Sequence, residues 1–446
     1  MNRSLKIFLL LLLGIFLTGL FTLNFSRNLF DLGVPHDSRQ WRPTDFVTFQ
    51  NDSEISVSLM LEKTKRDGLC STGGFMMNRA LDAPPYFSAW GLHGKIFSFF
   101  YRFSDDPVPV FMDKIRGVVA FCFGLLLSGF VLFCLIEFGW MAAAFLTIGV
   151  LWSDWMVFAG RNAYLVFFMH FLPMILAWIL YPRFQRKSGF NWPGYLAVIG
   201  GATLLNALCY FDYISNIVLS TATAPLYYGC RDGLPGRQII KGMFLTLAVS
   251  SVAVVIAILA TATQAGIWLG SLTSGFNEVL GAAASRMYGT AQIERAAPDS
   301  MPLLAIFNQY LTIPALTLPW LPKAGYYVFL SFFAFLGIGI PAALVAVLDG
   351  RRFPAVEAER RKLIGLSLAT LWGLGATLSW AFLMKGHMFH HPHINGMIFY
   401  LPYMMLLYVL IGKDMAVLAT GWFSKHPAPV IPVKATGEKP KRKASH

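Results

Sequence analysis

About ten apolar runs alternate with polar intervals along the chain. They cover residues 7–23, 115–135, 139–152, 163–181, 194–210, 214–230, 242–263, 326–348, 364–383 and 396–411. An α-helix needs roughly 20 apolar residues to cross a hydrocarbon core of about 30 Å, and most of these runs approach or reach that length. The run at 139–152 is short, and the run at 214–230 contains Ser, Thr and Pro. The pattern therefore predicts an all-α polytopic membrane protein with about ten transmembrane helices.

The polar intervals divide the chain into parts with different roles. These are an N-terminal signal-anchor span (1–24), a large external loop (25–113), transmembrane helices 2–7 (114–263), a second external segment (264–324), transmembrane helices 8–10 (325–412) and a basic cytoplasmic tail (413–446). No small-residue cleavage site follows the first run, so we expect it to remain as an anchor. The large loop is the only long polar interval, and its eleven carboxylates make it the best place for chemistry at the membrane surface.

The composition excludes a soluble globular protein, because 56% of the residues are hydrophobic and only 13% are charged. Soluble domains carry about twice that charged fraction. The net charge of +13 does not indicate nucleic-acid binding, because the basic clusters at 183–187 and 351–362 lie beside apolar runs and a third at 439–443 lies in the tail. Cytoplasmic loops of membrane proteins carry such cations.

The positive-inside rule also decides how the weak run at 214–230 is interpreted. Counting it as a crossing places Arg231, Arg237 and Lys241 in the cytoplasm, and omitting it places them outside. We therefore count it. Both termini are then cytoplasmic, and the two long external segments lie on the outer side of a multi-pass protein in the bacterial cytoplasmic membrane.

Five cysteines carry little information about function. Cys70 falls in the large loop and Cys209 near the end of an apolar run, so a disulfide between them and two free thiols both remain open.

Nearly every polar residue that hydropathy leaves unexplained falls on the external side of this topology. The residues concerned are Asp154, Arg161, Asn162, Asp212, Asn277, Glu278, Arg286, Tyr288 and the stretch 385–395. A charged side chain near bilayer depth is costly unless it is paired or faces water. Several such polar side chains on the external side of the membrane indicate a polar cavity there. Ordinary interfacial loops with local salt bridges are the alternative.

The stretch 385–395 contains four histidines close together, among them His387 and His391. They lack the Cys or carboxylate partners of a compact zinc site, and Pro392 disfavours helical geometry at His391. We therefore expect no metal here. Lys385 and the histidines suit contact with a lipid phosphate, and a solvated loop is the alternative.

Asp31 and Asp37 follow the first apolar run closely, which places them near membrane level. A carboxylate there could act as a general base that takes the proton of an attacking hydroxyl. It could equally hold Mg²⁺ or Mn²⁺ against a phosphate, or be a structural residue of the loop.

Aromatic residues alternate with Gly, His and Lys over residues 85–98, which include Tyr86, Trp90 and His93. This pattern is typical of an interfacial helix, either one that stacks on a sugar or one that only packs at headgroup level.

Four segments together resemble a known family, the bacterial multispan glycosyltransferases of the GT-C architecture. Residues 86–94 are similar to the pattern Y-x-S-Q-x-G-L-Q-G, residues 160–164 with 171–173 to G-R-N-x-Y … F-x-P, residues 211–215 to x-E-Y-I-S, and residues 385–393 with 400–402 to K-x-H-S-x-x-H … W-x-L-P. The order of these segments runs through most of the chain. Ala89 and His93 stand where Gln is usual, and Asp212 stands for Glu, which leaves the sugar and the acceptor open.

The resemblance implies transfer of a sugar from a polyprenyl-phosphate carrier to an external glycan or glycolipid, such as a polysaccharide or lipopolysaccharide. An acidic residue of the first external loop is the base in such enzymes, so Asp31 and Asp37 become the candidates, and Arg161 and Lys385 the candidates for carrier phosphate. Two alternatives remain: an O-antigen polymerase or ligase that uses a diphosphate-linked glycan, and a lipid-linked glycan transporter or flippase. A transporter is expected to show repeated halves, and the sequence shows no repeat.

Overall fold

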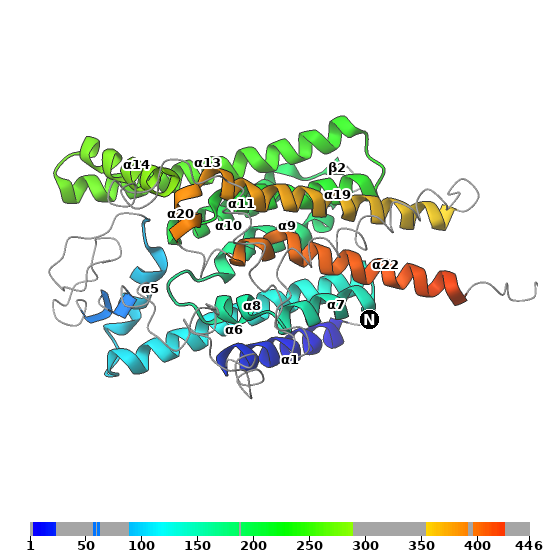
Figure 1. Cartoon of the computed structure of the whole chain (residues 1–446), viewed down its shortest axis with the longest axis horizontal. Coiled ribbons are helices and arrows are strands. Elements are labelled where there is room, and N and C mark those ends of the chain that lie inside the picture. The colour runs from blue at the N-terminus through cyan, green and yellow to red at the C-terminus, as the bar shows by residue number, and fades with distance from the viewer. Residues whose placement is uncertain are drawn as a thin grey trace, which may run out of the picture.

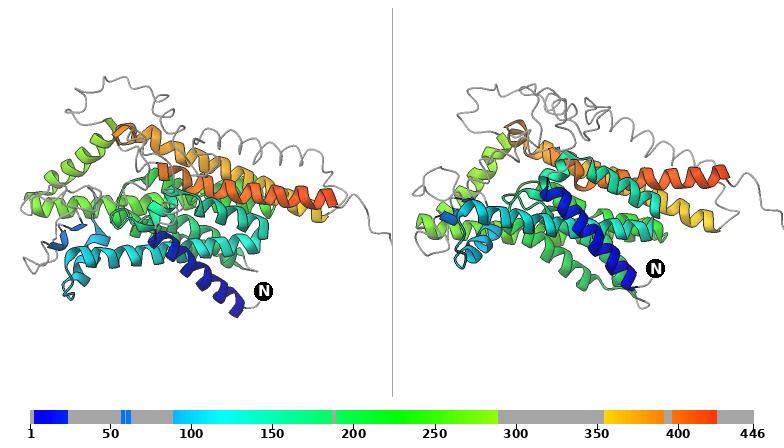
Figure 2. Two further views of the ribbon diagram at one scale, coloured as in Figure 1. Left: turned by 60° about the horizontal axis from the view of Figure 1, so that its bottom comes forward. Right: turned by 90° about the horizontal axis from the view of Figure 1, so that it is seen from below.

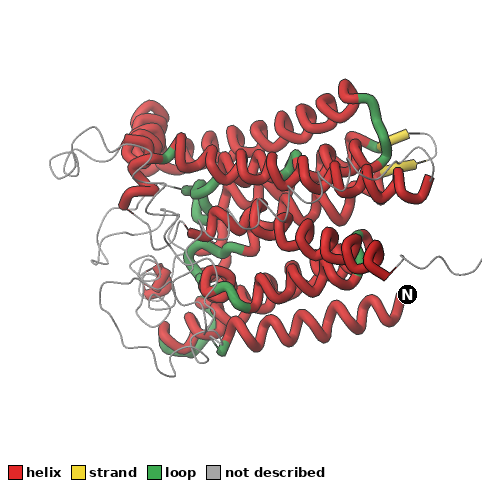
Figure 3. The backbone as a smooth tube through the Cα atoms, turned by 45° about the vertical axis from the view of Figure 1, so that its right-hand side comes forward, coloured by secondary structure: helices red, strands yellow, loops and turns green. Residues whose placement is uncertain are grey.

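Long helices make up nearly all of the structure, a computed structural model that describes residues 3–23, 57–58, 60–62, 89–186, 189–288, 354–390 and 396–423 (Figure 1). The helices of the first half are α1 (Arg3–Thr22), α5 (Leu92–Tyr101), α6 (Val108–Glu137), α7 (Trp140–Leu151), α8 (Asp154–Arg161), α9 (Phe168–Phe184) and α10 (Trp192–Cys209). Those of the second half are α11 (Ile214–Ser220), α12 (Thr223–Arg231), α13 (Gly236–Leu269), α14 (Leu272–Tyr288), α19 (Pro354–Leu383), α20 (Lys385–His390), the 3₁₀ turn η2 (Gly396–Phe399), the π turn η3 (Tyr400–Met404) and α22 (Met405–Phe423). Two short strands, β1 (Gln185–Arg186) and β2 (Gly189–Phe190), pair antiparallel at the turn between α9 and α10 (Figure 3).

Six helical segments in this part of the chain are long and apolar enough to cross a membrane. They are Ser4–Thr22, Val108–Glu137, Trp192–Cys209, Gly236–Leu269, Glu357–Leu383 and Met397–Val417. Two further helices, α7 and α8, meet at a 74° bend and give a seventh span if the bent pair counts as one. The protein is therefore a multi-pass helical membrane protein.

The expected number of about ten spans differs from this result at identifiable places. The run at 163–181 forms α9, which is apolar but shorter than the six spans. The run at 214–230 forms two short helices, α11 and α12, separated at Thr221 and Ala222. The run at 326–348 lies outside the described residues.

Close packing of small residues brings the central helices together. In Figure 1, α22 lies between α19 and α7, and its first half is buried. At Gly412 an added Cβ would come within 2.6 Å of the Ala142 backbone on α7, and at Gly149 it would meet the Tyr408 ring of α22. Small residues permit this approach in membrane bundles. α1 packs across α6 at the outer edge of the bundle (Figure 2).

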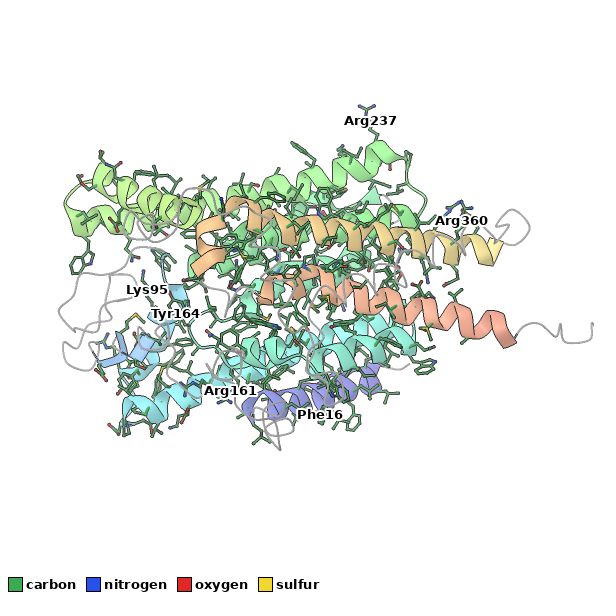
Figure 4. The ribbon with its side chains drawn as sticks, in the orientation of Figure 1. Phe16, Lys95, Arg161, Tyr164, Arg237 and Arg360 are labelled. Atoms are coloured by element: carbon green, nitrogen blue, oxygen red, sulfur yellow. The ribbon has the colours of Figure 1, made fainter. Side chains whose placement is uncertain are left out.

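The end of the bundle that carries Arg237 and Arg360 in Figure 4 is here called the basic end, and the opposite end the α5 end. A partly buried ion-pair network ties the elements at the basic end. Arg231 Nη1 lies 3.1 Å from Glu137 Oε1, and its Nε lies 2.7 Å from Asp232 Oδ1. Tyr227 donates to the same Glu137 oxygen at 2.7 Å. These contacts join the end of α6 to α12.

Aromatic side chains fill the interior behind this network. The rings of Trp178 and Tyr227 stack with centroids 4.9 Å apart, and those of Tyr181 and Tyr228 stack at 4.8 Å. Trp178 Nε1 donates to Thr223 Oγ1 at 2.8 Å, so this buried indole is satisfied. The packed rings leave the buried polar residues of the α5 end separated from the basic end.

Candidate functional site

A group of buried polar and aromatic side chains lies at the α5 end and is here called the α5-end cluster. It consists of His93, Tyr164, His170, Tyr210 and Asp212, each at most 5% exposed. The five residues come from α5, from the loop after α8, from α9 and from the junction of α10 and α11. Buried polar groups in such density are costly in a membrane protein, and they mark a functional site more often than a packing core.

His93 enters the cluster from the first turn of α5. The helix begins after Gly91, which has a φ of 70° and turns the chain into it. The His93 ring lies against the backbone of Tyr164, and burial lowers its pKa from the usual value of 6.5 to about 3, with the neighbouring His170 acting in the same direction. The imidazole is therefore neutral at physiological pH and offers one donor and one acceptor.

The loop after α8 is shaped by Asn162. Its side-chain oxygen accepts hydrogen bonds from the backbone N–H groups of Tyr164 at 3.1 Å and Leu165 at 2.6 Å. This local turn, which Asn adopts readily, directs Tyr164 inward, where its hydroxyl donates to the Tyr210 hydroxyl at 3.0 Å. Val166 follows with a φ of 42°, which is rare for a β-branched residue.

The junction of α10 and α11 supplies the carboxylate. Asp212 is fully buried, and it lies close enough to His170 for the two side chains to interact electrostatically. Tyr213 has a φ of 61°, and its ring lies 5.7 Å from that of His170 and 5.4 Å from that of Trp380 on α19. Two positive-φ residues around one buried site are a form of backbone strain that concentrates at functional positions.

The segment from η2 to η3 supports the junction from the other side. Asn216 Nδ2 donates to the carbonyl of Ile398 at 3.1 Å, and Thr377 Oγ1 donates to the same oxygen at 3.2 Å. Ser379 Oγ donates to Ser215 Oγ at 3.0 Å. These contacts hold α11, α19 and the start of the last span in one fixed arrangement.

The structure brings some of the predicted site residues together and separates others. His93 and Asp212 both belong to the α5-end cluster, and Asn162 shapes its loop. Arg161, half-buried in the last turn of α8, lies beside α1 and α6 in Figure 4. The helix that begins at Lys385, α20, packs on α14 and α19 at the other side of the bundle in Figure 1, so the two cations are not brought into one pocket.

Some of the remaining predicted residues lie outside the described residues, and the others lie within them. Those that lie outside are Asp31, Asp37, Tyr86 and His391, and also Cys70. The backbone of His387 belongs to α20. Trp90 precedes α5, and the ammonium of Lys95 lies 3.5 Å above its ring centroid. Cys209 is buried and forms no disulfide with another described cysteine.

No group of three or more His, Cys, Asp or Glu side chains in the described parts of the chain is placed to hold a metal ion. Asp31 and Asp37, for which binding of Mg²⁺ or Mn²⁺ was one of the open roles, lie outside those parts.

His170 was not among the candidates drawn from the sequence. It lies within the apolar run that forms α9. This position could have identified it as a candidate, because an ionisable residue inside a span is rare unless it has a partner. The partner, Asp212, is more than forty residues away and belongs to another helix junction.

Together these features define a class: a multi-pass α-helical membrane protein with a buried, strained polar cluster at one end of its bundle. No family model, no curated protein and no solved structure matches the chain.

Proposed function

We propose that the protein is an integral-membrane glycosyltransferase, which moves a sugar from a polyprenyl-phosphate carrier to a cell-surface glycan or glycolipid acceptor. The observation that supports this most is the meeting of separate segments that resemble the GT-C enzymes. His93 of the first segment lies against Tyr164 of the second, and Asp212 of the third lies beside His170. The fourth contributes Tyr400, Leu401 and Pro402 to η3, which packs against α9 and α11.

The proposed topology has about ten crossings, with both termini in the cytoplasm of a bacterium. It includes the span expected at 326–348 and counts α9 and the α11–α12 pair as crossings. Arg237 and Arg360 then lie on the cytoplasmic side, as the positive-inside rule requires. The α5-end cluster and the large loop lie on the periplasmic or extracellular side, where a lipid carrier in the outer leaflet and a surface glycan both have access.

In the proposed reaction the acceptor oxygen attacks the anomeric carbon and forms a new glycosidic bond. The bond to the carrier phosphate breaks, and the phosphate leaves with the electron pair. The proton of the acceptor hydroxyl goes to a carboxylate, for which Asp37 and Asp31 are the candidates. A cation, either a Lys or Arg side chain or a divalent metal, stabilises the departing phosphate. Arg161 and Lys385 are the two alternative candidates for this cation, because they lie apart in the bundle, and the α5-end cluster would orient the reacting sugar.

The first test incubates purified protein in bilayers with polyprenyl-phosphate sugars and measures release of the free carrier. We expect Asp37→Ala or Asp31→Ala to lower the transfer rate about 10²- to 10⁴-fold, the usual contribution of a general base. Asp212→Asn should also lower it. The matched control is Asp113→Ala, because Asp113 is exposed and pairs only with Arg116 at 2.6 Å among the described residues. Transfer at the wild-type rate in both loop variants would contradict the proposed base.

The same assay separates the alternatives. An O-antigen polymerase or ligase is expected to depend on Arg and His, so loss of activity in the loop variants with tolerance of Arg161→Ala disfavours it. Uptake of a lipid-linked glycan into liposomes without any transfer would replace the proposal with a transporter.

A further inference from the structure

Three residues at the α5 end, outside the α5-end cluster, form a second polar arrangement. Lys95 projects from α5, and its Nζ donates to Gln264 Oε1 on α13 at 2.5 Å. The same Nζ lies 3.5 Å above the ring centroid of Trp90. Figure 4 shows Lys95 at this end of the bundle, between α5 and the α13–α14 hairpin.

Gln264 supplies the observation that points to a ligand. Its side chain is only 8% exposed, and its Nε2 atom is buried with no hydrogen-bond partner among the described residues. A buried amide nitrogen without an acceptor is costly. Because Nε2 and Oε1 belong to one amide group, Nε2 lies close to the Lys95 ammonium. Two donors, one of them charged, are thus held side by side.

The α13–α14 hairpin fixes the position of Gln264. α14 folds back on α13, and a Cβ at Gly275 would collide with the backbone of Ala262 and Gly266, on either side of Gln264. The backbones are therefore in direct contact at this level. A donor on a rigid element loses little freedom when a ligand binds, which favours recognition.

We propose that Trp90, Lys95 and Gln264 form a subsite for the carboxylate of an acidic sugar, such as a uronic acid. A carboxylate presents two acceptor oxygens, one for Lys95 Nζ and one for Gln264 Nε2. When the ammonium turns toward the carboxylate, it uncovers the face of Trp90, and the apolar C–H face of the sugar ring covers that face instead. In the ligand-free protein the cation–π contact occupies the same place.

The assignment of this sugar to the glycan acceptor rests on the proposed function. The subsite itself does not, because it is defined by binding chemistry alone. A neutral sugar lacks the charge that the two donors require. A lipid phosphate supplies the charge and lacks the ring that would cover Trp90.

The test measures saturation-transfer NMR signals of D-glucuronate, D-glucose and geranyl phosphate on the purified full-length protein. We expect a clear signal for glucuronate and at least a fivefold weaker one for glucose. Lys95→Met should reduce the glucuronate signal at least fivefold. Gln264→Glu should do the same, because its carboxylate would pair with Lys95 and repel the ligand. The matched control, Lys114→Met, removes an exposed lysine of α6 that pairs with Asp106 at 2.6 Å, and should bind like wild type.

Three results would overturn the proposal: undiminished glucuronate binding by both the Lys95→Met and the Gln264→Glu protein, equal signals from glucose, or Lys95-dependent binding of geranyl phosphate alone. Thermal melting of each variant shows that it is folded. The binding readout also stands apart from catalysis. Lys95-dependent glucuronate binding without any carrier-dependent transfer would contradict the proposed glycosyltransferase activity and support the subsite. Carrier-dependent transfer without glucuronate binding would support the glycosyltransferase activity and contradict the subsite.

Discussion

At the scale of single residues, His93 shows how burial sets the chemistry of the site. The ring is 4% exposed and its pKa lies near 3, so it carries no charge under physiological conditions. It can therefore orient a hydroxyl or a phosphate by hydrogen bonds and does not act as a fixed cation. A neutral imidazole is also less costly to bury than a charged one.

This burial predicts a specific loss of stability in acid. Below pH 6.5 His93 becomes protonated in the unfolded chain, whereas in the folded protein it stays neutral down to about pH 3. The free energy of unfolding therefore decreases as the pH falls below 6.5. The expected slope is about 1.4 kcal/mol per pH unit, or roughly 2 kcal/mol between pH 6.5 and pH 5. Thermal melting of wild type and His93→Gln over this range should show a flatter dependence for the variant. Parallel curves would contradict the assigned burial of a neutral ring.

The sequence selected some residues of the site and missed others for physical reasons. Asp212 stood out because it lies in a short interval between two apolar runs, and His93 because it lies in the stretch 85–98, where aromatic residues alternate with Gly, His and Lys. His170 did not, since it lies inside such a run and its proximity to Asp212 depends on tertiary packing. Arg161 and Lys385 were both selected for their charge near the membrane surface. Charge and local order carry no information on which side of a bundle a residue lies, and the structure separates the two.

At the scale of elements, hydropathy located the helices and did not show where they break. The short run at 139–152 ends where Ser153 accepts a hydrogen bond from the Met156 N–H at 3.2 Å and starts α8 at a sharp angle. Ser153 can be recognised as an N-cap only when it is known that a new helix starts after it, and the hydropathy of the sequence does not show this. The break between α11 and α12, at Thr221 and Ala222, was likewise hidden in a run that contains no charged residue.

The close crossing of α7 and α22 can be tested at Gly412. A methyl group there would come within 2.6 Å of backbone atoms of Ala142 and Met141, which cannot turn away as a side chain can. We expect Gly412→Ala to destabilise the protein by about 1–3 kcal/mol, the usual cost of overpacking. The measurement is thermal unfolding in detergent.

The matched control is Gly201→Ala on α10, where an added Cβ meets nothing within 4 Å. This change should be neutral or stabilising by up to about 1 kcal/mol, because Ala favours a helix over Gly. Equal melting temperatures for the two variants would show that α7 and α22 do not cross as closely as described.

At the scale of the whole molecule, the arrangement has two chemically different ends. Arg237 and Arg360 mark one, while the α5-end cluster and the contact of Lys95 with Gln264 mark the other. The aromatic packing around Trp178 separates them. The composition predicted a multi-pass helical protein correctly, and the described residues bear out six or seven of the spans.

Sidedness is tested by labelling single cysteines in a cysteine-free protein in intact cells. We expect Ser71→Cys and Ser271→Cys to react with an impermeant maleimide, and Ser424→Cys to react only after the membrane is opened. Ser271 lies in the turn between α13 and α14, at the α5 end. Labelling of Ser424→Cys in intact cells would reverse the topology and move the proposed reaction to the other face.

The enclosure of α22 also has a consequence for how the protein is made. Among the described helices it is the last to leave the ribosome, yet it occupies the middle, with α7 on one side and α19 on the other. Earlier helices can enter the bilayer one by one, but their final spacing has to wait for the C-terminal one. Assembly of the described helices is therefore expected to end with the insertion of α22. A polypeptide truncated before Gly396 would lack the helix against which both α7 and α19 pack.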